Sequence, residues 1–197
     1  MNAMKRLTHE DLYSLEKYAQ MRTQMRAQVL EHKKPRAVAI GSNATLYFED
    51  RLTMQYQIQE MLRVERVFER EGIEDELNAY NPMIPDGTNL KATFMLEYGD
   101  ETERRAALVE LKGVEDRVWM QVQGLDKVWA ISDEDLERTN EEKTSAVHFL
   151  RFEFSPAMIS ALNKGAALSV GIDHAAYRYD VSPLASPVRA ALMKDFS

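Results

Sequence analysis

The pattern of apolar and polar residues predicts a long helix at the start of the chain. Residues 8–32 begin with Thr8 as a capping residue and end before Pro35, which cannot continue a helix. The apolar positions form only a thin stripe, made of Leu12, Leu15, Ala19, Met25 and Val29. A helix of this length with so narrow a stripe either lies across a sheet or packs on a partner helix. We therefore treat residues 1–34 as a helical extension that packs on the rest of the domain or on another chain.

A second helix is predicted between Asp50, its N-cap, and Gly72, the left-handed residue past its end. Helical spacing gives it an inward stripe of Met54, Ile58, Met61, Leu62 and Phe68. Glu65 falls on the same stripe, so we expect a buried carboxylate there. Residues 73–80 follow as a short acidic helix.

The remaining apolar runs predict seven strands in all and three further helices. The strands are expected at 36–40, 44–48, 91–98, 117–123, 127–131, 146–154 and 168–172. The helices are expected at 101–111, at 156–165 and from Pro187. This order predicts one α+β domain over residues 1–197, with a mostly antiparallel mixed sheet flanked by helices. Its strand–helix–strand unit at 146–172 is either a parallel crossover or an antiparallel return.

Composition and charge exclude several classes of function. The chain has no cysteine, which excludes disulfides, thiolate metal ligands and cysteine nucleophiles. The net charge of −7 disfavours nucleic acid and anionic membrane surfaces as partners. The first residues carry no apolar signal segment, and no apolar run is long enough to cross a membrane. We expect a soluble cytoplasmic protein.

Charge is unevenly distributed along the chain. Residues 1–36 hold eight Lys or Arg against four acids, whereas residues 97–142 hold six against fourteen. Opposite potentials of this kind favour contact between the basic first helix and the acidic half, within one molecule or between two. We therefore predict a homodimer formed through the first helix.

Candidate catalytic and metal-binding residues are few. His148 shares a strand face with Leu150 and should point inward or into a cleft, as a hydrogen-bonded core histidine or a site residue. Asp173 and His174 follow directly on a strand end, where working residues often lie. Glu65 is a candidate general base or ligand, or the buried partner of an arginine. If these four residues bind a metal, iron, manganese or zinc is expected.

Two further features leave alternatives open. Asn81, Asp86 and Asn89, with Thr88, surround two prolines and a glycine, as either a ligand-contact loop or a turn fixed by its own side chains. Trp119 and Trp129 share a sheet face if their hairpin has a three-residue loop at 124–126, which pairs residue 121 with 129. A two-residue loop separates the two rings. Tryptophans on one face would suggest an apolar binding surface or a subunit contact.

Four separated motifs resemble one bacterial family. They are Tyr47-Phe48-Glu49-Asp50-Arg51, Tyr56-Gln57-Ile58-Gln59-Glu60-Met61-Leu62-Arg63, Ala79-Tyr80-Asn81-Pro82-Met83-Ile84-Pro85-Asp86-Gly87 and Glu142-Lys143-Thr144-Ser145-Ala146-Val147-His148-Phe149-Leu150-Arg151-Phe152-Glu153. In this order they are similar to domain of unknown function 3501, over most of the chain. That family implies no established activity or catalytic residues. Its members lie near genes for rubrerythrin-like and iron–sulfur proteins, which implies a role beside redox chemistry.

Three functional hypotheses follow. The first is a binding or accessory protein linked to redox or metal proteins, with a redox protein as possible partner. The second is an enzyme that acts through His148, Glu65 and the 81–89 loop. The third is a structural protein that forms oligomers, with its first helix buried between chains. Convergence of the candidate residues in one cleft would separate the second hypothesis from the others.

Overall fold

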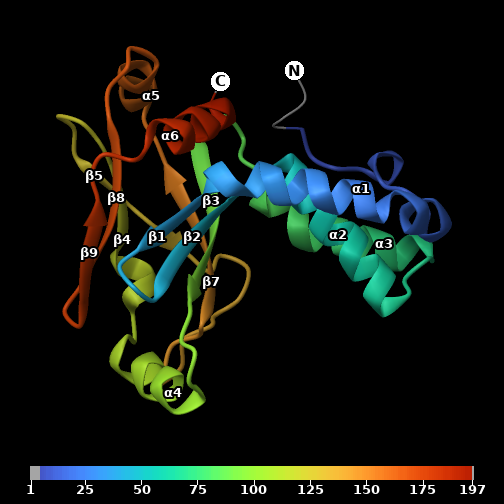
Figure 1. The fold of residues 1–197 in the computed structure, drawn as a ribbon, viewed down its shortest axis with the longest axis horizontal. Coiled ribbons are helices and arrows are strands. Elements are labelled where there is room, and N and C mark those ends of the chain that lie inside the picture. Colours follow the sequence, from blue (N-terminus) through green and yellow to red (C-terminus); the bar gives the residue numbers. More distant parts are fainter. Residues whose placement is uncertain (1–4, 197) are drawn as a thin grey trace.

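The computed structural model describes residues 5–196, which form a β-body and a helical arm that projects from it (Figure 1). The helices are α1 (Leu15–Lys33), α2 (Arg51–Glu65), α3 (Arg70–Tyr80), α4 (Glu101–Glu110), α5 (Pro156–Asn163) and α6 (Ser186–Leu192). The strands are β1 (Ala37–Ile40), β2 (Ala44–Glu49), β3 (Asn89–Leu96), β4 (Val118–Val122), β5 (Lys127–Trp129), β6 (Ile131–Ser132), β7 (Val147–Glu153), β8 (Leu168–His174) and β9 (Tyr177–Val181). Helices α1, α2 and α3 make up the arm, and all the strands lie in the β-body. The predicted α+β class is confirmed.

The β-body contains two antiparallel sheets. Sheet A has the strand order β1-β2-β3-β7-β6, and sheet B has the order β5-β4-β8-β9. Their inner faces share one apolar core, in which Leu46, Phe94 and Leu150 of sheet A join Met120 and Val170 of sheet B. The sequence pattern gave one mixed sheet instead of two. It shows which residues share a face but not which strands share a sheet.

The strand–helix–strand unit connects the two sheets. Strand β7 pairs with β3 along one edge and with β6 along the other, so β8 does not pair with β7. Helix α5 carries the chain from β7 in sheet A to β8 in sheet B, where β8 pairs antiparallel with β4 and β9. The unit is therefore present, but β7 and β8 lie in different sheets, so both the parallel crossover and the antiparallel return are wrong. Strand β9 was not predicted.

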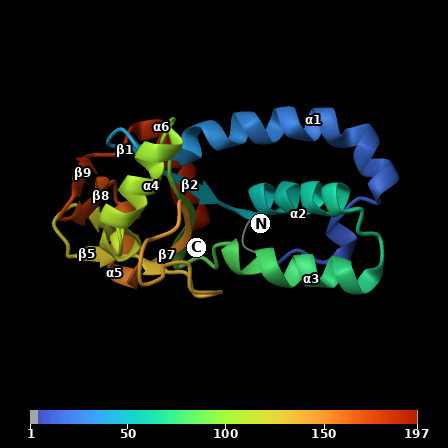
Figure 2. The same ribbon diagram turned by 90° about the horizontal axis from the view of Figure 1, so that it is seen from below.

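Helix α1 packs along α2 of the same chain, as two views of the arm show (Figures 1 and 2). Its buried residues Tyr18, Met25 and Val29 lie against Leu52 and Tyr56 at the start of α2. Burying this stripe stabilises the helix pair, because α1 has few other apolar residues to remove from water. The arm is thus closed by contacts within one molecule.

The second predicted helix is split in two. Helix α2 ends where Arg66 adopts a left-handed conformation, with φ of 56°. Phe68, expected on the inward stripe, is 73% exposed in the connection to α3. Gly72 lies in the first turn of α3, where a Cβ atom would come 2.6 Å from Val67. Gly72 therefore permits the close approach of the connection to α3, and its predicted role as the end of the helix is wrong.

An ion pair between α1 and α2 should make stability depend on pH. Arg22 binds the Glu60 carboxylate through two nitrogens at 2.7 and 2.9 Å, and this lowers the pKa of Glu60 to about 2. A folded-state pKa below the unfolded value stabilises the fold above the unfolded pKa, and that stability is lost as pH falls toward 2. Because solvent reaches the pair from the Arg22 side, we expect Glu60→Gln to remove about 1 kcal/mol of unfolding free energy at pH 7 and much less at pH 2.5.

Urea unfolding of both proteins across this pH range tests the expectation. Glu101→Gln is the control, since Glu101 forms an exposed pair with Arg105 on α4. Parallel pH profiles for the wild type and Glu60→Gln would show that the pair contributes nothing.

Candidate functional site

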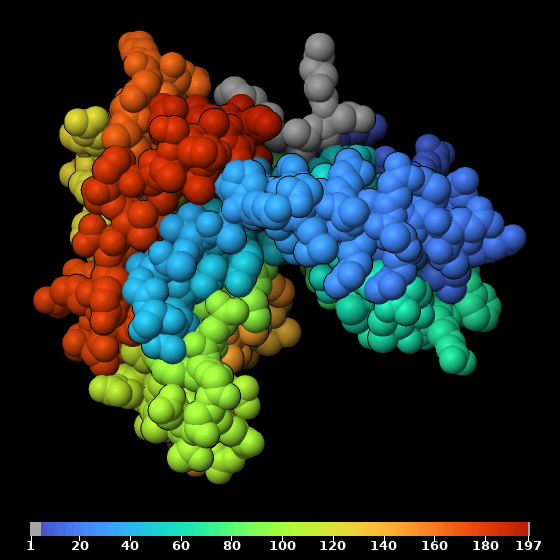
Figure 3. All heavy atoms as spheres, in the orientation of Figure 1, coloured from blue at the N-terminus to red at the C-terminus, as the bar shows by residue number. Residues whose placement is uncertain are grey.

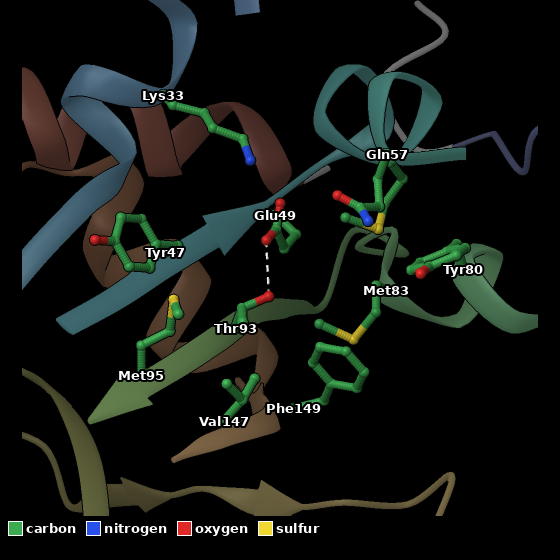
Figure 4. A pocket seen from close by; sticks show the side chains of 11 residues that line it. Lys33, Tyr47, Glu49, Gln57, Tyr80, Met83, Thr93, Met95, Val147 and Phe149 are labelled. Carbon is green, nitrogen blue, oxygen red and sulfur yellow. Dashed lines mark hydrogen bonds between the residues drawn. The ribbon is translucent and has the colours of Figure 1, made fainter. Parts of the chain in front are cut away.

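A pocket of about 390 Å³ lies where the helical arm meets the outer face of sheet A (Figure 4). We call it the arm–sheet pocket. Sheet A contributes Tyr47, Glu49, Thr93, Met95, Val147 and Phe149, and the arm contributes Lys33, Met54, Gln57, Tyr80 and Met83. The space-filling view shows the surface hollowed between the arm and the lower part of the β-body (Figure 3). The pocket therefore has walls from segments far apart in the sequence.

Strand register explains how sheet A builds its wall. Tyr47 of β2 pairs with Thr93 of β3, which pairs with Phe149 of β7, so the three side chains form one row across the sheet. In the next row toward the arm, Glu49 pairs with Lys91, which pairs with Arg151. These residues alternate along each strand with the core residues of the inner face. On an uncovered sheet this mixed polar and apolar face would meet solvent, but here the arm covers part of it.

Glu49 is the unusual residue of the pocket. It is only 5% exposed, and its Oε1 accepts a hydrogen bond of 2.8 Å from the Thr93 hydroxyl. Its Oε2 is buried and has no hydrogen-bond partner among residues 5–196. A buried carboxylate oxygen without a partner costs about 1–3 kcal/mol or more, so such atoms are rare outside sites of function or strain. Glu49 thus supplies a free acceptor inside a largely apolar pocket.

The cations beside Glu49 on sheet A bind elsewhere. Lys91 donates to the main-chain carbonyl of Pro82, and burial lowers the pKa of this lysine. Arg151 binds Glu134 through two nitrogens at 2.8 and 2.9 Å and also pairs with Glu153. Neither cation neutralises the carboxylate in the pocket.

A buried arginine fixes the backbone that carries Glu49. Arg36 is 2% exposed and donates to the main-chain carbonyls of Phe48 and Glu49 at 3.0 and 3.2 Å, and its guanidinium also binds Asp195 near the C-terminus. The next residue, Asp50, caps α2 by accepting from two main-chain amides. The end of β2 therefore contacts both the arm, through the Asp50 cap, and the C-terminal segment, through Arg36 and Asp195. These contacts fix the position of Glu49.

His148 points into the β-body, as its strand position predicted, and is fully buried. Its Nδ1 lies 2.6 Å from Asp133, and its Nε2 lies 2.9 Å from the Thr144 hydroxyl and 3.8 Å from Glu115. Asp133 begins an acidic stretch of the sequence, yet its side chain is only 9% exposed. This arrangement is that of a hydrogen-bonded core histidine, and His148 is not among the residues that line the arm–sheet pocket.

The other metal candidates lie on other elements than His148. Glu65 is exposed at the last residue of α2, so the prediction that it is buried is wrong, because the helix ends before the stripe continues. Asp173 and His174 lie at the end of β8 in sheet B, where Asp173 pairs with Arg178. Among residues 5–196, no three His, Asp or Glu side chains gather closely enough to hold a metal ion.

The 81–89 loop is held by its own side chains. Asn81 binds the main chain of Leu7 through both its oxygen and its nitrogen, at 2.7 and 2.9 Å. Asp86 accepts from the amide and hydroxyl of Thr88, and Asn89 donates to Glu153. All three candidate ligand-binding residues therefore have partners within the chain, which is the arrangement of an ordered turn.

The two tryptophans share the outer face of sheet B. Trp119 pairs directly with Trp129, and Gln121 pairs with Lys127, so the expected pairing of residue 121 with 129 is wrong, and residues 123–126 connect the two strands. The Lys127 ammonium lies 4.1 Å from the centre of the Trp119 ring and 5.5 Å from that of Trp129. Trp129 is 41% exposed. The alternative with both rings on one face is confirmed, and a binding or subunit contact there remains a prediction.

Sequence reasoning missed Glu49 and Lys33 as site residues. Both residues lie in segments that the sequence analysis described. Glu49 is part of one of the family-like motifs, and Lys33 lies at the end of the first predicted helix. Alternation along β2 gives the face of Glu49, but only the packing of the arm buries it. The available signal was an acid at a strand end directly before the helix cap Asp50.

The fold and the pocket together define an α+β protein with two stacked sheets, a helical arm and a pocket at their joint. The chain belongs to the family described as "Protein of unknown function (DUF3501)", whose model matches residues 6–196. The resemblance seen in its motifs is thus confirmed. No functionally curated protein matches the chain.

A similar solved structure comes from Burkholderia pseudomallei K96243. It is the 1.90 Å crystal structure of a novel protein of unknown function, 52% identical in sequence, and the match covers 98% of this chain and 100% of that one. The TM-score is 0.93. No helix among residues 5–196 has the length and apolar character needed to span a membrane.

Proposed function

We propose that the protein binds a small organic molecule in the arm–sheet pocket, with Glu49 as the polar anchor. The free Oε2 of this buried carboxylate is the observation that carries the proposal. A ligand with an N–H or O–H group would supply the missing hydrogen bond and remove the cost of leaving the oxygen unpaired. The bound ligand would therefore offset the free-energy cost of burying this carboxylate.

The size and walls of the pocket support the same proposal. A volume of about 390 Å³ lies within the range of small-molecule sites, which are mostly apolar with a few placed polar groups. The walls hold three methionines, Met54, Met83 and Met95, whose flexible thioethers fit irregular ligand shapes. Phe149 and Tyr47 add aromatic surface. An apolar body with one donor group matches this lining.

A thermal-shift screen tests the proposal. A panel of small amines, alcohols, carboxylic acids and zwitterions is added to the wild type and to Glu49→Gln. A ligand present at 100 times its Kd stabilises the fold by about 2.7 kcal/mol, which should raise the Tm of a chain this long by about 5–10 °C. We expect such shifts for compounds with a donor group, and much smaller shifts in Glu49→Gln.

The control is Glu103→Gln, an exposed acid on α4 far from the pocket. It should respond as the wild type does. If no compound stabilises the wild type more than it stabilises Glu49→Gln, Glu49 is not a ligand anchor and the proposal fails.

An accessory role beside redox or metal proteins remains a second proposal, which the family resemblance supports. A small-molecule binding protein in the cytoplasm would fit such a role.

The homodimer also remains a proposal, and its support is the charge segregation along the chain. Elemental analysis of untagged protein tests the link to metal proteins, and light scattering at micromolar concentration tests the homodimer. A metal-free, monomeric protein would leave pocket binding as the better supported function.

A further inference from the structure

We infer that the ligand of the arm–sheet pocket is a small zwitterion with an apolar side chain, of which the apolar α-amino acids are the simplest members. This inference rests on the function proposed above and names the ligand class for the same pocket. Three features of the described residues 5–196 carry it: the buried acid Glu49 has no cation paired with it there, the adjacent Lys33 has no acid, and the wall is apolar.

The buried carboxylate of Glu49 favours a ligand with a cationic group. Glu49 lies in one row with Lys91 and Arg151, but Arg151 pairs with Glu134 and Glu153, and Lys91 donates to a main-chain carbonyl. A neutral hydroxyl would satisfy the hydrogen bond of Oε2 and leave the buried charge unbalanced. An ammonium group supplies both the donor and the opposite charge, and such charge-assisted bonds are about twice as strong as neutral ones.

The ammonium group of Lys33 favours a ligand with an anionic group. Lys33, the last residue of α1, lines the pocket, and Figure 4 shows its side chain extending from the helix toward the side of the pocket where Glu49 lies. Its neighbours in the sequence are paired, His32 with Asp50 and Lys34 with Glu31. Among residues 5–196, no ion pair joins Lys33 to the free oxygen of Glu49. A ligand that carries an ammonium and a carboxylate on neighbouring atoms can bind both side chains at once.

The apolar wall sets the remaining part of the ligand. Met83 from the arm and Val147 and Phe149 from β7 face the same cavity as Glu49 (Figure 4). These side chains bury aliphatic and aromatic groups equally well, because thioether and ring surfaces are polarisable and Met is flexible. The wall therefore favours an apolar side chain over a polar one. It does not distinguish leucine from methionine or phenylalanine.

Calorimetric titration with three matched probes tests the inference. The probes are L-phenylalanine, phenethylamine, which lacks the carboxylate, and 3-phenylpropionate, which lacks the amine. Each is titrated into the full-length wild type, Glu49→Gln and Lys33→Met, with Lys34→Met as control. L-Leucine and L-methionine are titrated alongside as aliphatic zwitterions.

We expect L-phenylalanine to bind the wild type and to bind about tenfold more weakly to either Glu49→Gln or Lys33→Met, the usual loss of one charged hydrogen bond. Phenethylamine should depend on Glu49 alone and 3-phenylpropionate on Lys33 alone. Lys34→Met should behave as the wild type.

Two results would overturn the inference and leave pocket binding intact. One is equal affinity for phenethylamine and L-phenylalanine with no effect of Lys33→Met, which makes the ligand a simple cation. The other is failure of all three amino acids to bind while a compound from the thermal-shift panel still depends on Glu49. Failure of every compound in both experiments would remove the proposed function as well.

Discussion

Replacement of Arg36 by methionine is expected to lower the free energy of unfolding by about 3–5 kcal/mol at pH 8. Arg36 is 2% exposed and is bound to Asp195, which is 4% exposed. Its guanidinium also donates to three main-chain carbonyls, those of Phe48, Glu49 and Ala191. Methionine preserves much of the packing but leaves a buried carboxylate and three carbonyls without their donor. The loss comes from these stranded groups.

The expected loss depends on pH in a defined direction. Burial raises the pKa of Asp195 to about 6, although Arg36 acts in the opposite direction. Without Arg36 that pKa rises further, so at pH 5 the carboxyl holds a proton and carries no buried charge. A raised acid pKa means that the fold binds a proton which the unfolded chain releases, and stability falls as pH rises toward the folded value. Arg36→Met should therefore cost less at pH 5 than at pH 8.

Urea unfolding at the two pH values measures this effect. Arg178→Met is the matched control, because Arg178 is 75% exposed in its pair with Asp173 and should change stability by less than about 1 kcal/mol. If Arg36→Met is as stable as that control, the buried cluster does not hold the strand end that carries Glu49.

Replacement of His148 by alanine is the second large effect, at about 3–5 kcal/mol. The imidazole binds Asp133, Thr144 and the main-chain carbonyl of Ser145 and lies near Glu115. Its removal opens a cavity in the core and deprives two nearly buried carboxylates, those of Asp133 and Glu115, of the imidazole that lies between them. For a chain of this length the Tm should fall by about 6–20 °C.

Calorimetric unfolding of His148→Ala against His9→Ala provides the measurement. His9 is exposed near the start of the arm, and its replacement should leave the Tm within about 2 °C of the wild type. Similar Tm values for the two variants would show that the His148 cluster is not part of the structural core. That result would also return His148 to the list of functional candidates.

Much of the strand pattern was predictable, because a period of two is a local property of the backbone. Alternation along residues 146–154 placed His148 on the inner face, where the structure has it. The same alternation runs through Tyr177-Arg178-Tyr179-Asp180-Val181, so β9 carried a signal that went unused. Assignment of strands to two sheets depends on long-range pairing, which one sequence does not display.

The candidate site was less predictable for a related reason. Glu65 was expected inside because the helix was extended to Gly72, whereas Arg66 adopts the left-handed conformation without needing glycine. Glu49 was overlooked because its strand face is polar, and only the arm turns that face into a pocket wall. Asp133 begins an acidic stretch of the sequence, yet it is the partner of His148. The Glu65 error concerns the local end of a helix, and the other two concern contacts between segments that are distant in the sequence.

Methyl NMR of methionine-labelled protein tests the central claim most directly, because the pocket residues Met54, Met83 and Met95 report on ligand binding. Met120, buried between the two sheets, is an internal control. The probe is the amine or zwitterion that raises the Tm most in the thermal-shift panel. Ligand binding on Glu49 predicts that the three pocket signals shift in the wild type, that the signal of Met120 stays in place, and that about ten times more ligand is needed for the same shifts in Glu49→Gln. Unmoved pocket signals, or equal shifts in both proteins, would contradict the account.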